Sequence, residues 1–293
     1  MSETANKDEK SPLRVVVLTH GAAELILEKV ARLETIEIVG VFLETETARQ
    51  RSLREKLRRS IRYDGWAATL KKFFAPVLRA KTAGAREQQT IAERQNATAE
   101  TAARLKIPVH FVSNLHSAEA MDLLRATDAD LGLLCGTNII RESVFSIPRL
   151  GSINLHQGLA PFYRGGPSVF WELFNDEKEV GLTVHWVAAK VDTGDIIRQT
   201  TVPLRYDFSY GADYEKFIDK FLETTREPCA ELIAEAVRMI AAGEVVGTPQ
   251  NTTLGKRYRL PVKREKDEIR RRLRERMKTQ SAEVRADGRR VTN

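Results

Sequence analysis

Apolar residues in this chain occur as short runs separated by stretches with helical spacing. Residues 14–19 (RVVVLT) and 36–43 (IEIVGVFL) are β-branched and apolar, as expected of strands buried on both faces. Between them, residues 22–33 carry apolar side chains three and four positions apart, which predicts a helix. Strand, helix and strand within thirty residues predict a βαβ unit with parallel strands.

The pattern changes twice further along. Residues 45–105 are rich in Arg, Lys, Ala and Glu and predict two or three helices. The strand and helix alternation then resumes, with strands expected at 107–112, 131–135, 152–155, 180–187 and 196–202, and helices at 117–126 and 143–147. Residues 212–242 predict an almost continuous helix, followed by a polar link and a basic tail.

These elements predict an α/β fold with a Rossmann-like, mostly parallel sheet and helices on both faces. We expect a flexible leader at 1–12 and a main domain at 13–205, interrupted by a basic helical insertion at 45–105. Residues 206–293 are expected to form a helical C-terminal extension with a basic tail.

Composition narrows the class of protein. The chain has 293 residues, of which 42% are hydrophobic, so it can bury a core and is not expected to be disordered. Cys135 and Cys229 are its two cysteines, which excludes a disulfide framework and favours a reducing compartment. No apolar run approaches the roughly 20 residues that span a bilayer, and the polar start lacks the apolar stretch of a secretory signal. We therefore expect a cytoplasmic location and no transmembrane segment.

The formal net charge of +7 is unevenly distributed. Residues 49–81 hold eleven Lys or Arg against two acids, and residues 256–278 hold twelve against four, so the rest of the chain is net acidic. Such segments occur in nucleic-acid-binding proteins, but solvated helical surfaces are the commoner explanation. In the tail, the spacing of Asp267 with Arg271 and of Glu268 with Arg272 favours a surface helix.

The first basic segment also contains an apolar face. Its aromatic and aliphatic residues stand among lysines and could touch a membrane or a partner. Packing into the core is the expectation that we favour for them: Trp66, Leu70, Phe73 and Phe74.

Residues 154–167 form the longest stretch without a predicted helix or strand, and they follow a predicted core strand. In open parallel sheets, ligands bind beyond the carboxyl ends of the strands. Asn154 and His156 stand two positions apart at such an end, so an extended backbone points both side chains to one face. An amide that stabilises an oxyanion beside an imidazole that exchanges protons suits acyl transfer.

A second turn, at residues 191–196, joins the last two predicted strands. Asp192 in this turn could orient and polarise His156. Structural alternatives stay open: a single His at a strand end is more often a structural residue, and Asp-x-Gly-Asp is an ordinary turn. No metal-ligand set is predicted.

Residues 151–199 join Asn-x-His, a Leu-x-Pro turn, Tyr-Arg-Gly, Gly-x-Thr-x-His and Asp-x-Gly-x-Ile in this order. The segment thereby resembles the signature of the N10-formyltetrahydrofolate-dependent formyltransferases. That family includes methionyl-tRNA formyltransferases, glycinamide ribonucleotide formyltransferases and nucleotide-sugar N-formyltransferases. Its Rossmann-like catalytic domain is compatible with the strand pattern of about half of this chain.

The resemblance implies roles for individual residues. Asn154, His156 and Asp192 match the catalytic residues of the family, and His185 matches a histidine that we expect to support them. N10-formyltetrahydrofolate is implied as the formyl donor. The residues that match the walls of its pterin pocket are Cys135, Gly136, Ile139, Ile140, Gly158, Leu159, Ala160, Pro161 and Val187. Those expected to contact the acceptor are Tyr163, Arg164 and Gly165.

The acceptor is narrowed by two features. The turn at residues 19–24 has one Gly and an acidic residue, which makes it a poor phosphate cradle and argues against glycinamide ribonucleotide; it is not a dinucleotide fingerprint either. Methionyl-tRNA formyltransferases add a β-rich C-terminal domain, whereas residues 206–293 predict helices. We therefore favour a small amine, a nucleotide-linked amino sugar, over nucleic acid. A methionyl-tRNA formyltransferase-like enzyme, a formyltetrahydrofolate hydrolase, a catalytically inactive protein that binds acidic surfaces, and a homodimer stay open.

Overall fold

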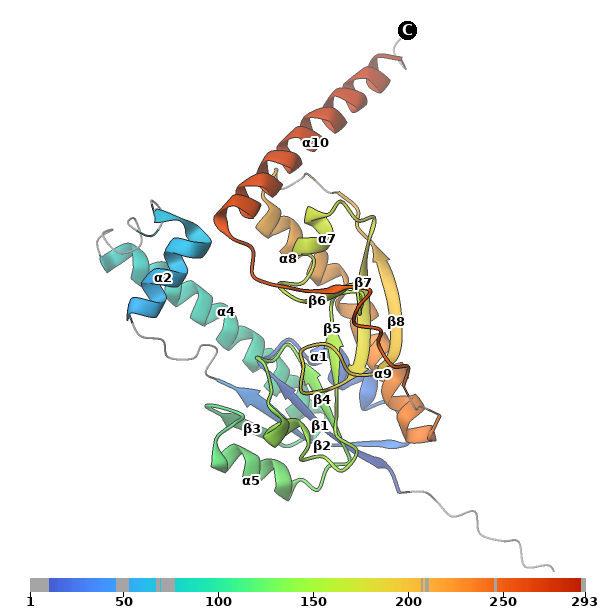
Figure 1. Ribbon diagram of the computed structural model, residues 1–293. Helices are drawn as coiled ribbons and strands as arrows, with labels where there is room; N and C mark the ends of the chain where they lie inside the picture. Colours follow the sequence, from blue (N-terminus) through green and yellow to red (C-terminus); the bar gives the residue numbers. More distant parts are fainter. Residues whose placement is uncertain are drawn as a thin grey trace, which may run out of the picture.

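The computed structural model describes residues 11–45, 53–66, 69, 77–206, 208, 211–244 and 247–290. Its centre is a seven-stranded sheet in the order β3-β2-β1-β4-β5-β7-β8 (Figure 1). The parallel strands are β1 (Leu13–Thr19), β2 (Ile36–Glu44), β3 (Val109–Val112), β4 (Leu131–Cys135) and β5 (Ser152–His156). Two antiparallel strands complete one side, β7 (Glu179–Trp186) and β8 (Ile196–Pro203). The predicted α/β fold with a mostly parallel sheet is confirmed.

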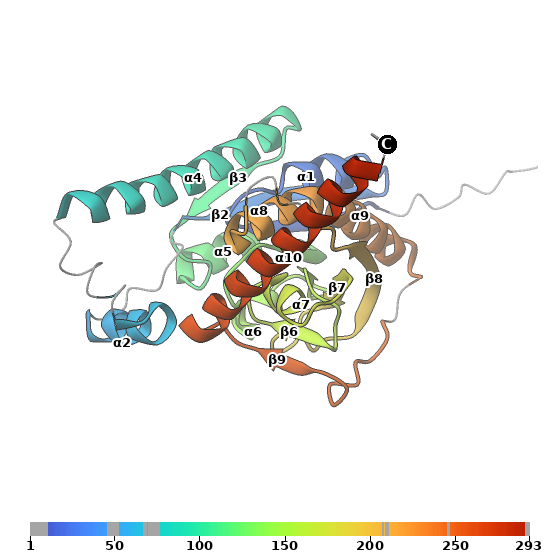
Figure 2. The same ribbon diagram turned by 90° about the horizontal axis from the view of Figure 1, so that it is seen from above.

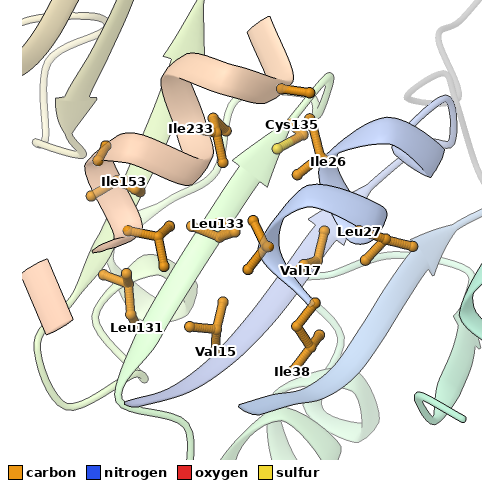
Figure 3. Close-up of a cluster of buried hydrophobic side chains, with 14 of the residues drawn as sticks. Val15, Val17, Ile26, Leu27, Ile38, Leu131, Leu133, Cys135, Ile153 and Ile233 are labelled. Carbon is orange, nitrogen blue, oxygen red and sulfur yellow. The ribbon is translucent and has the colours of Figure 1, made fainter. Parts of the chain in front are cut away.

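Helices cover both faces because successive strand residues point to opposite sides. Val15 and Val17 of β1 face one apolar cluster, whereas Val16 and Leu18 face another. The first cluster is closed by α1 (Glu24–Val30), α4 (Val77–Arg104) and α9 (Arg226–Ala242), and the second by α5 (Ala118–Ala126) and α6 (Glu142–Phe145). Figure 3 shows Ile26 and Leu27 of α1 and Ile233 of α9 packed over the strands.

The C-terminal third of the chain contributes to this core. The helix expected at 212–242 is two helices, α8 (Tyr214–Thr224) and α9, which meet at the buried Thr225. Cys229, Ile233 and Val237 of α9 lie in the same apolar cluster as β1 and β4. The division expected at residue 205 therefore does not coincide with a break in the core.

The basic tail is partly buried. It forms α10 (Lys263–Arg290), whose Ile269 and Leu273 are 2% and 3% exposed and pack with α8 and with α7 (Phe170–Phe174). The predicted ion pair between Glu268 and Arg272 is present. The pair predicted between Asp267 and Arg271 is wrong: Asp267 pairs with Lys263 and Arg270, and Arg271 pairs with Glu268 and Glu275.

The two basic segments lie side by side. The start of α10 contacts α2 (Leu53–Asp64), and both Figures 1 and 2 show the two helices adjacent. Gly65, just after α2, approaches the side chain of Lys263 so closely that a Cβ there would stand 2.5 Å from its Cδ. Core packing is wrong for Trp66, which is 66% exposed; Leu70, Phe73 and Phe74 lie outside the described residues.

The structure describes the state of the two cysteines and the apolarity of the helices. Cys135 and Cys229 are both free thiols, and both are buried. Across the described parts of the chain, no helix has the length and apolarity required to cross a membrane.

The stretch expected to be irregular contains a short strand. β6 (Tyr163–Gly165) pairs in parallel with β9 (Lys256–Tyr258), a strand more than ninety positions later. A three-residue segment such as Tyr-Arg-Gly carries no periodicity, so the sequence pattern could not predict it. This two-stranded sheet fixes the loop that follows β5.

Candidate active site

A cleft of about 1540 Å³ opens at the carboxyl ends of the parallel strands. It is lined by His20 after β1, by residues 134–140 around the end of β4, and by Asn154 and His156 on β5. The turn after β7, residues of α4 and α8, and Arg257 of β9 complete its walls. The cleft therefore lies where a parallel sheet is expected to bind ligands.

Asn154, His156 and Asp192 come together in this cleft. Asp192 Oδ2 lies 3.5 Å from His156 Nδ1, and Asp192 Oδ1 lies 3.5 Å from Nε2 of His185. His185 on β7 is paired in register with Asn154 on β5, and the Asn154 Nδ2 atom lies 3.3 Å from His185 Nε2. The carboxylate of Asp192 thus lies beside the imidazoles of His156 and His185, and His185 lies beside the amide of Asn154.

The carboxylate of Asp192 is fixed from three sides. Besides the two imidazoles, the backbone N–H of Gly165 on β6 donates to Asp192 Oδ2 at 2.8 Å. Asp192 itself has a φ of +52°, a conformation that Asp tolerates better than most residues. Burial acts to raise its pKa, but the neighbouring His185 and His156 and the N–H of Gly165 outweigh this and lower the pKa of Asp192 to about 2. Asp192 is therefore a permanent negative charge at neutral pH.

His156 faces a hydrogen-bond acceptor at each ring nitrogen. Nε2 lies 2.7 Å from the carbonyl oxygen of Tyr163, and Nδ1 faces Asp192. Burial lowers the pKa of His156, while the charge of Asp192 and the Tyr163 carbonyl oppose this change. Burial thus favours release of the proton, and the two acceptors stabilise the imidazole when it carries one.

His185 positions the amide. Its Nδ1 lies 2.7 Å from the carbonyl oxygen of Trp186, and its Nε2 lies 3.3 Å from Asn154 Nδ2 and 3.5 Å from Asp192 Oδ1. The ring therefore lies between the amide of Asn154 and the carboxylate of Asp192. His185 is only 2% exposed, which fits the supporting position expected for it.

The expected donor pocket is found only in part. Cys135, Gly136, Ile139, Ile140 and Val187 all line the cleft. The turn at 158–161 does not: Ala160 is buried at 2% exposure, and Leu159 faces a different cavity. A Cβ on Gly158 would lie 2.4 Å from His156 Nε2, so the absence of a side chain here leaves room for the imidazole. Gly158, Leu159, Ala160 and Pro161 do not line the cleft, and their contact with the donor stays a prediction.

Of the three adjacent residues expected to contact the acceptor, only Gly165 lines the cleft. Gly165 lines the cleft and holds Asp192. Tyr163 gives only its carbonyl to His156, because its hydroxyl donates to Glu177 at 2.6 Å on the other side of β6. Arg164 is 8% exposed and its guanidinium donates to the carbonyl oxygens of Pro161, Thr252 and Gly255. Arg164 therefore ties the loop to the segment before β9 and does not reach the cleft.

Sequence reasoning missed a second polar group, which lies behind the cleft wall and contacts His20 and Asn138 of its lining. Glu44 at the end of β2 is 4% exposed; it accepts from the Leu115 N–H at 3.0 Å and lies 2.6 Å from His20 Nε2. Asn138 Nδ2 lies 3.5 Å from the same carboxylate. The available signal was an acid at the end of an apolar strand. Within the described residues, no group of His, Cys, Asp and Glu is arranged to hold a metal ion.

The cleft also contains cations without carboxylate partners. In the described parts of the chain, Arg94, Lys216 and Arg257 line the cleft and form no ion pair, whereas Arg226 is paired with Glu24. Arg257 lies against β6, since a Cβ on Gly165 would stand 3.1 Å from its Cγ and 3.5 Å from its Nε. Its alternation with Lys256 and Tyr258 along β9 places it on the cleft side.

Residues 14–221 match the family model described as formyl transferase. Among curated proteins, the chain is 30% identical over 158 residues to methionyl-tRNA formyltransferase of Chlorobium chlorochromatii, which covers 54% of this chain and 48% of that protein. It is 32% identical over 155 residues to the enzyme of that name from Chlorobium limicola, covering 53% and 46%. The chain spans about half the length of the curated relatives it matches.

Solved structures share the fold. Phosphoribosylglycinamide formyltransferase from Anaplasma phagocytophilum superposes with a TM-score of 0.53 at 21% identity, covering 86% of this chain and 100% of that one. At such identity the likeness concerns the arrangement of strands and helices and does not identify a substrate.

Proposed function

Because the chain belongs to the formyl transferase family, we propose that it transfers the formyl group of N10-formyltetrahydrofolate to a primary amine, that of a nucleotide-linked amino sugar. The observation that carries this proposal is the meeting of Asn154, His156 and Asp192 in one cleft. Formyl transfer needs an oxyanion donor, a proton-transfer group and a charge that orients it, and these three side chains supply them.

The donor fits the wall formed by residues 135–140 and the loop that begins at Val187. Backbone groups and apolar side chains of the first segment suit a flat heterocycle, with Ile139 68% exposed at the cleft. The formyl carbon must then lie within hydrogen-bond reach of Asn154, whose free N–H donates to the oxygen as negative charge develops on it. A preorganised donor of this kind is typically worth about 10²–10³ in rate.

His156 and Asp192 handle the protons. When the amine attacks, its nitrogen becomes acidic and must lose a proton, and the departing N10 must gain one. His156 can accept the first and deliver the second, and ionised Asp192 stabilises the imidazolium that exists between these steps. Positioned acid–base groups contribute about 10²–10⁴ in rate.

The unpaired cations of the cleft support an anionic acceptor. Arg94, Lys216 and Arg257 offer guanidinium and ammonium groups that suit phosphate oxygens, and Arg257 lies beside the strand that holds Asp192. A diphosphate bound by these residues would bring an attached amino sugar to the catalytic groups.

The test is a panel of amines incubated with the protein and N10-formyltetrahydrofolate, with the acceptor analysed by mass spectrometry. We expect one formyl group to be added to an amino sugar linked to a nucleoside diphosphate, and none by Asn154→Ala or Asp192→Asn. Formylation of Met-tRNA alone, or formate release that does not depend on any amine, would refute the proposed acceptor.

A second candidate, formylation of Met-tRNA, is favoured by one observation. α2 and α10 bring together two basic segments that are two hundred positions apart (Figure 2). This surface could bind phosphates of a nucleic acid, in which case binding would weaken steeply with salt. Arg58→Glu combined with Arg274→Glu, on exposed positions of α2 and α10, would then abolish tRNA formylation but leave amino-sugar formylation unchanged.

A further inference from the structure

A second cavity lies on the other side of β6 and β9. Its volume is about 840 Å³, and it shares no lining residue with the catalytic cleft. Along β9, Lys256 and Tyr258 face this cavity and Arg257 faces the cleft, as alternation in a strand requires. The thin sheet of β6 and β9 is therefore the wall between two separate spaces, and we name the second one the acidic pocket.

A buried carboxylate that has no cationic partner among the described residues faces the acidic pocket. Glu172 of α7 is 3% exposed and lines the cavity. Within the described residues its carboxylate accepts from its own backbone N–H and makes no bond to another residue, and the charge that acts on it, that of Glu177, has the same sign. Burial, with a contribution from Glu177, raises the pKa of Glu172 to about 7. Carboxylates are rarely buried in this way unless a partner neutralises them.

The other carboxylates of the pocket differ from Glu172. Glu177 accepts from the Tyr163 hydroxyl, and Asp176 accepts from Tyr206 and pairs with Arg276. Carboxylates nevertheless outnumber cations among the lining residues: Glu172, Asp176, Glu177 and Glu179 against Lys178 and Lys256. At a pH where Glu172 is ionised, this excess favours a positively charged ligand.

Aromatic rings form an adjoining wall. Tyr163 and Tyr258 stack with ring centroids 5.2 Å apart, and the Asn175 amide donates to both hydroxyls at 3.0 and 3.1 Å. The Lys256 ammonium already lies 4.7 Å from the centre of the Tyr258 ring. Aromatic faces beside carboxylates are the usual surroundings of bound organic ammonium groups.

We propose that the acidic pocket is a binding site for a polyamine, separate from the catalytic cleft, in which Glu172 pairs with one ammonium group of the ligand. The volume, the excess of carboxylates and the tyrosine wall all match a flexible chain with several ammonium groups. This inference does not depend on the proposed formyl transfer, because binding can be measured without turnover.

Spermidine is the probe, titrated calorimetrically into the full-length protein at pH 6 and pH 8. Wild type should bind more tightly at pH 8, since more of Glu172 is ionised there; the other charged groups that face the site are Asp176, Glu177, Lys178, Glu179 and Lys256. Glu172→Gln should weaken binding at pH 8 by about tenfold or more and remove most of the pH dependence. Glu119→Gln, an exposed acid on α5 away from both cavities, is the matched control and should bind as wild type does.

Hydrogen exchange locates the site independently of affinity. Saturating spermidine should slow amide exchange in peptides covering 159–165 and 252–258, and it should not do so in Glu172→Gln. Exchange that slows instead around 216–226, on the cleft, would overturn the proposal. So would equal spermidine affinity in wild type and Glu172→Gln, or no measurable binding to wild type at pH 8.

Discussion

The cleft that contains Asp192 and the acidic pocket lie on opposite sides of the same short strands, and each contains a buried carboxylate in a different state. In the cleft, Asp192 is held by two imidazoles and a backbone N–H, and its pKa falls to about 2. In the acidic pocket, Glu172 has no such partners and its pKa rises to about 7. Both residues are carboxylates that the fold has removed from water.

The difference shows that partners, more than burial, decide the state of a buried acid. Burial acts to raise the pKa in both cases, yet only at Asp192 do neighbouring donors outweigh it. A carboxylate with hydrogen-bond donors from the chain stays ionised and in a fixed position. A carboxylate without such donors can be stabilised in its ionised form by a cationic ligand. Four substitutions test this contrast.

Replacing the fixed charge should have the largest effect. Asp192→Asn should lower kcat for formyl transfer about 10³-fold, because the imidazolium of His156 loses the charge that stabilises it and the imidazole loses its orientation. Asp195→Asn in the same turn is the control and should change kcat little. Since the pKa of Asp192 is about 2, a fall in wild-type activity on mild acidification would report protonation of an imidazole and not of this carboxylate. Full activity in Asp192→Asn would remove the carboxylate from the mechanism.

Displacing the imidazole should come next. Gly158→Ala places a Cβ where His156 Nε2 and the Tyr163 carbonyl now lie, at 2.4 and 2.7 Å, so the ring must move. A misplacement of about 1 Å typically costs about 10²-fold in rate, and we expect kcat to fall accordingly with a smaller change in KM. Gly40→Ala, where the nearest atom is 3.6 Å away, should retain activity. Equal kinetics in the two variants would contradict the geometry described for His156.

Replacing Glu172 of the acidic pocket should change the free energy of unfolding in a way that depends on pH. Between about pH 4.5 and 7, Glu172 ionises in the unfolded chain but keeps its proton in the fold, so wild-type stability falls as pH rises through this window. Glu172→Gln removes that loss and should be more stable than wild type by about 3 kcal/mol at pH 8, with little difference at pH 4. Urea unfolding of wild type and variant at the two pH values measures this difference in the free energy of unfolding. A variant that is less stable than wild type at pH 8 would show that Glu172 has an ionic partner in the fold.

The smallest effect is expected from the rim of the cleft. Arg257→Ala should raise KM for the phosphorylated acceptor about tenfold, the loss of one exposed charge-assisted contact, and leave kcat nearly unchanged. Lys256→Ala, the neighbour that faces the acidic pocket, should leave this KM unaltered. A larger effect from Lys256 than from Arg257 would mean that the acceptor binds on the other side of the sheet.

Local sequence patterns determined most of the sheet and its helices. The apolar run of β1 and that of β4 could be located within a residue, because strands buried on both faces need apolar side chains at every position. The helix predicted at 117–126 is α5, and Ser117 caps it through a contact between near neighbours. The meeting of Asn154 and His156 at a strand end followed from the same reasoning, and the assignment of their chemical roles came from the family signature and stays a prediction.

Only the tertiary structure decided what depends on distant partners. β6 exists because β9 pairs with it, α9 belongs to the core because it covers β1 and β4, and Arg164 turns away from the cleft because carbonyls near residue 252 receive it. The same holds for the two buried acids. The sequence contains Asp192 and Glu172 alike as carboxylates, and their opposite pKa shifts arise from neighbours that folding brings to one of them and withholds from the other.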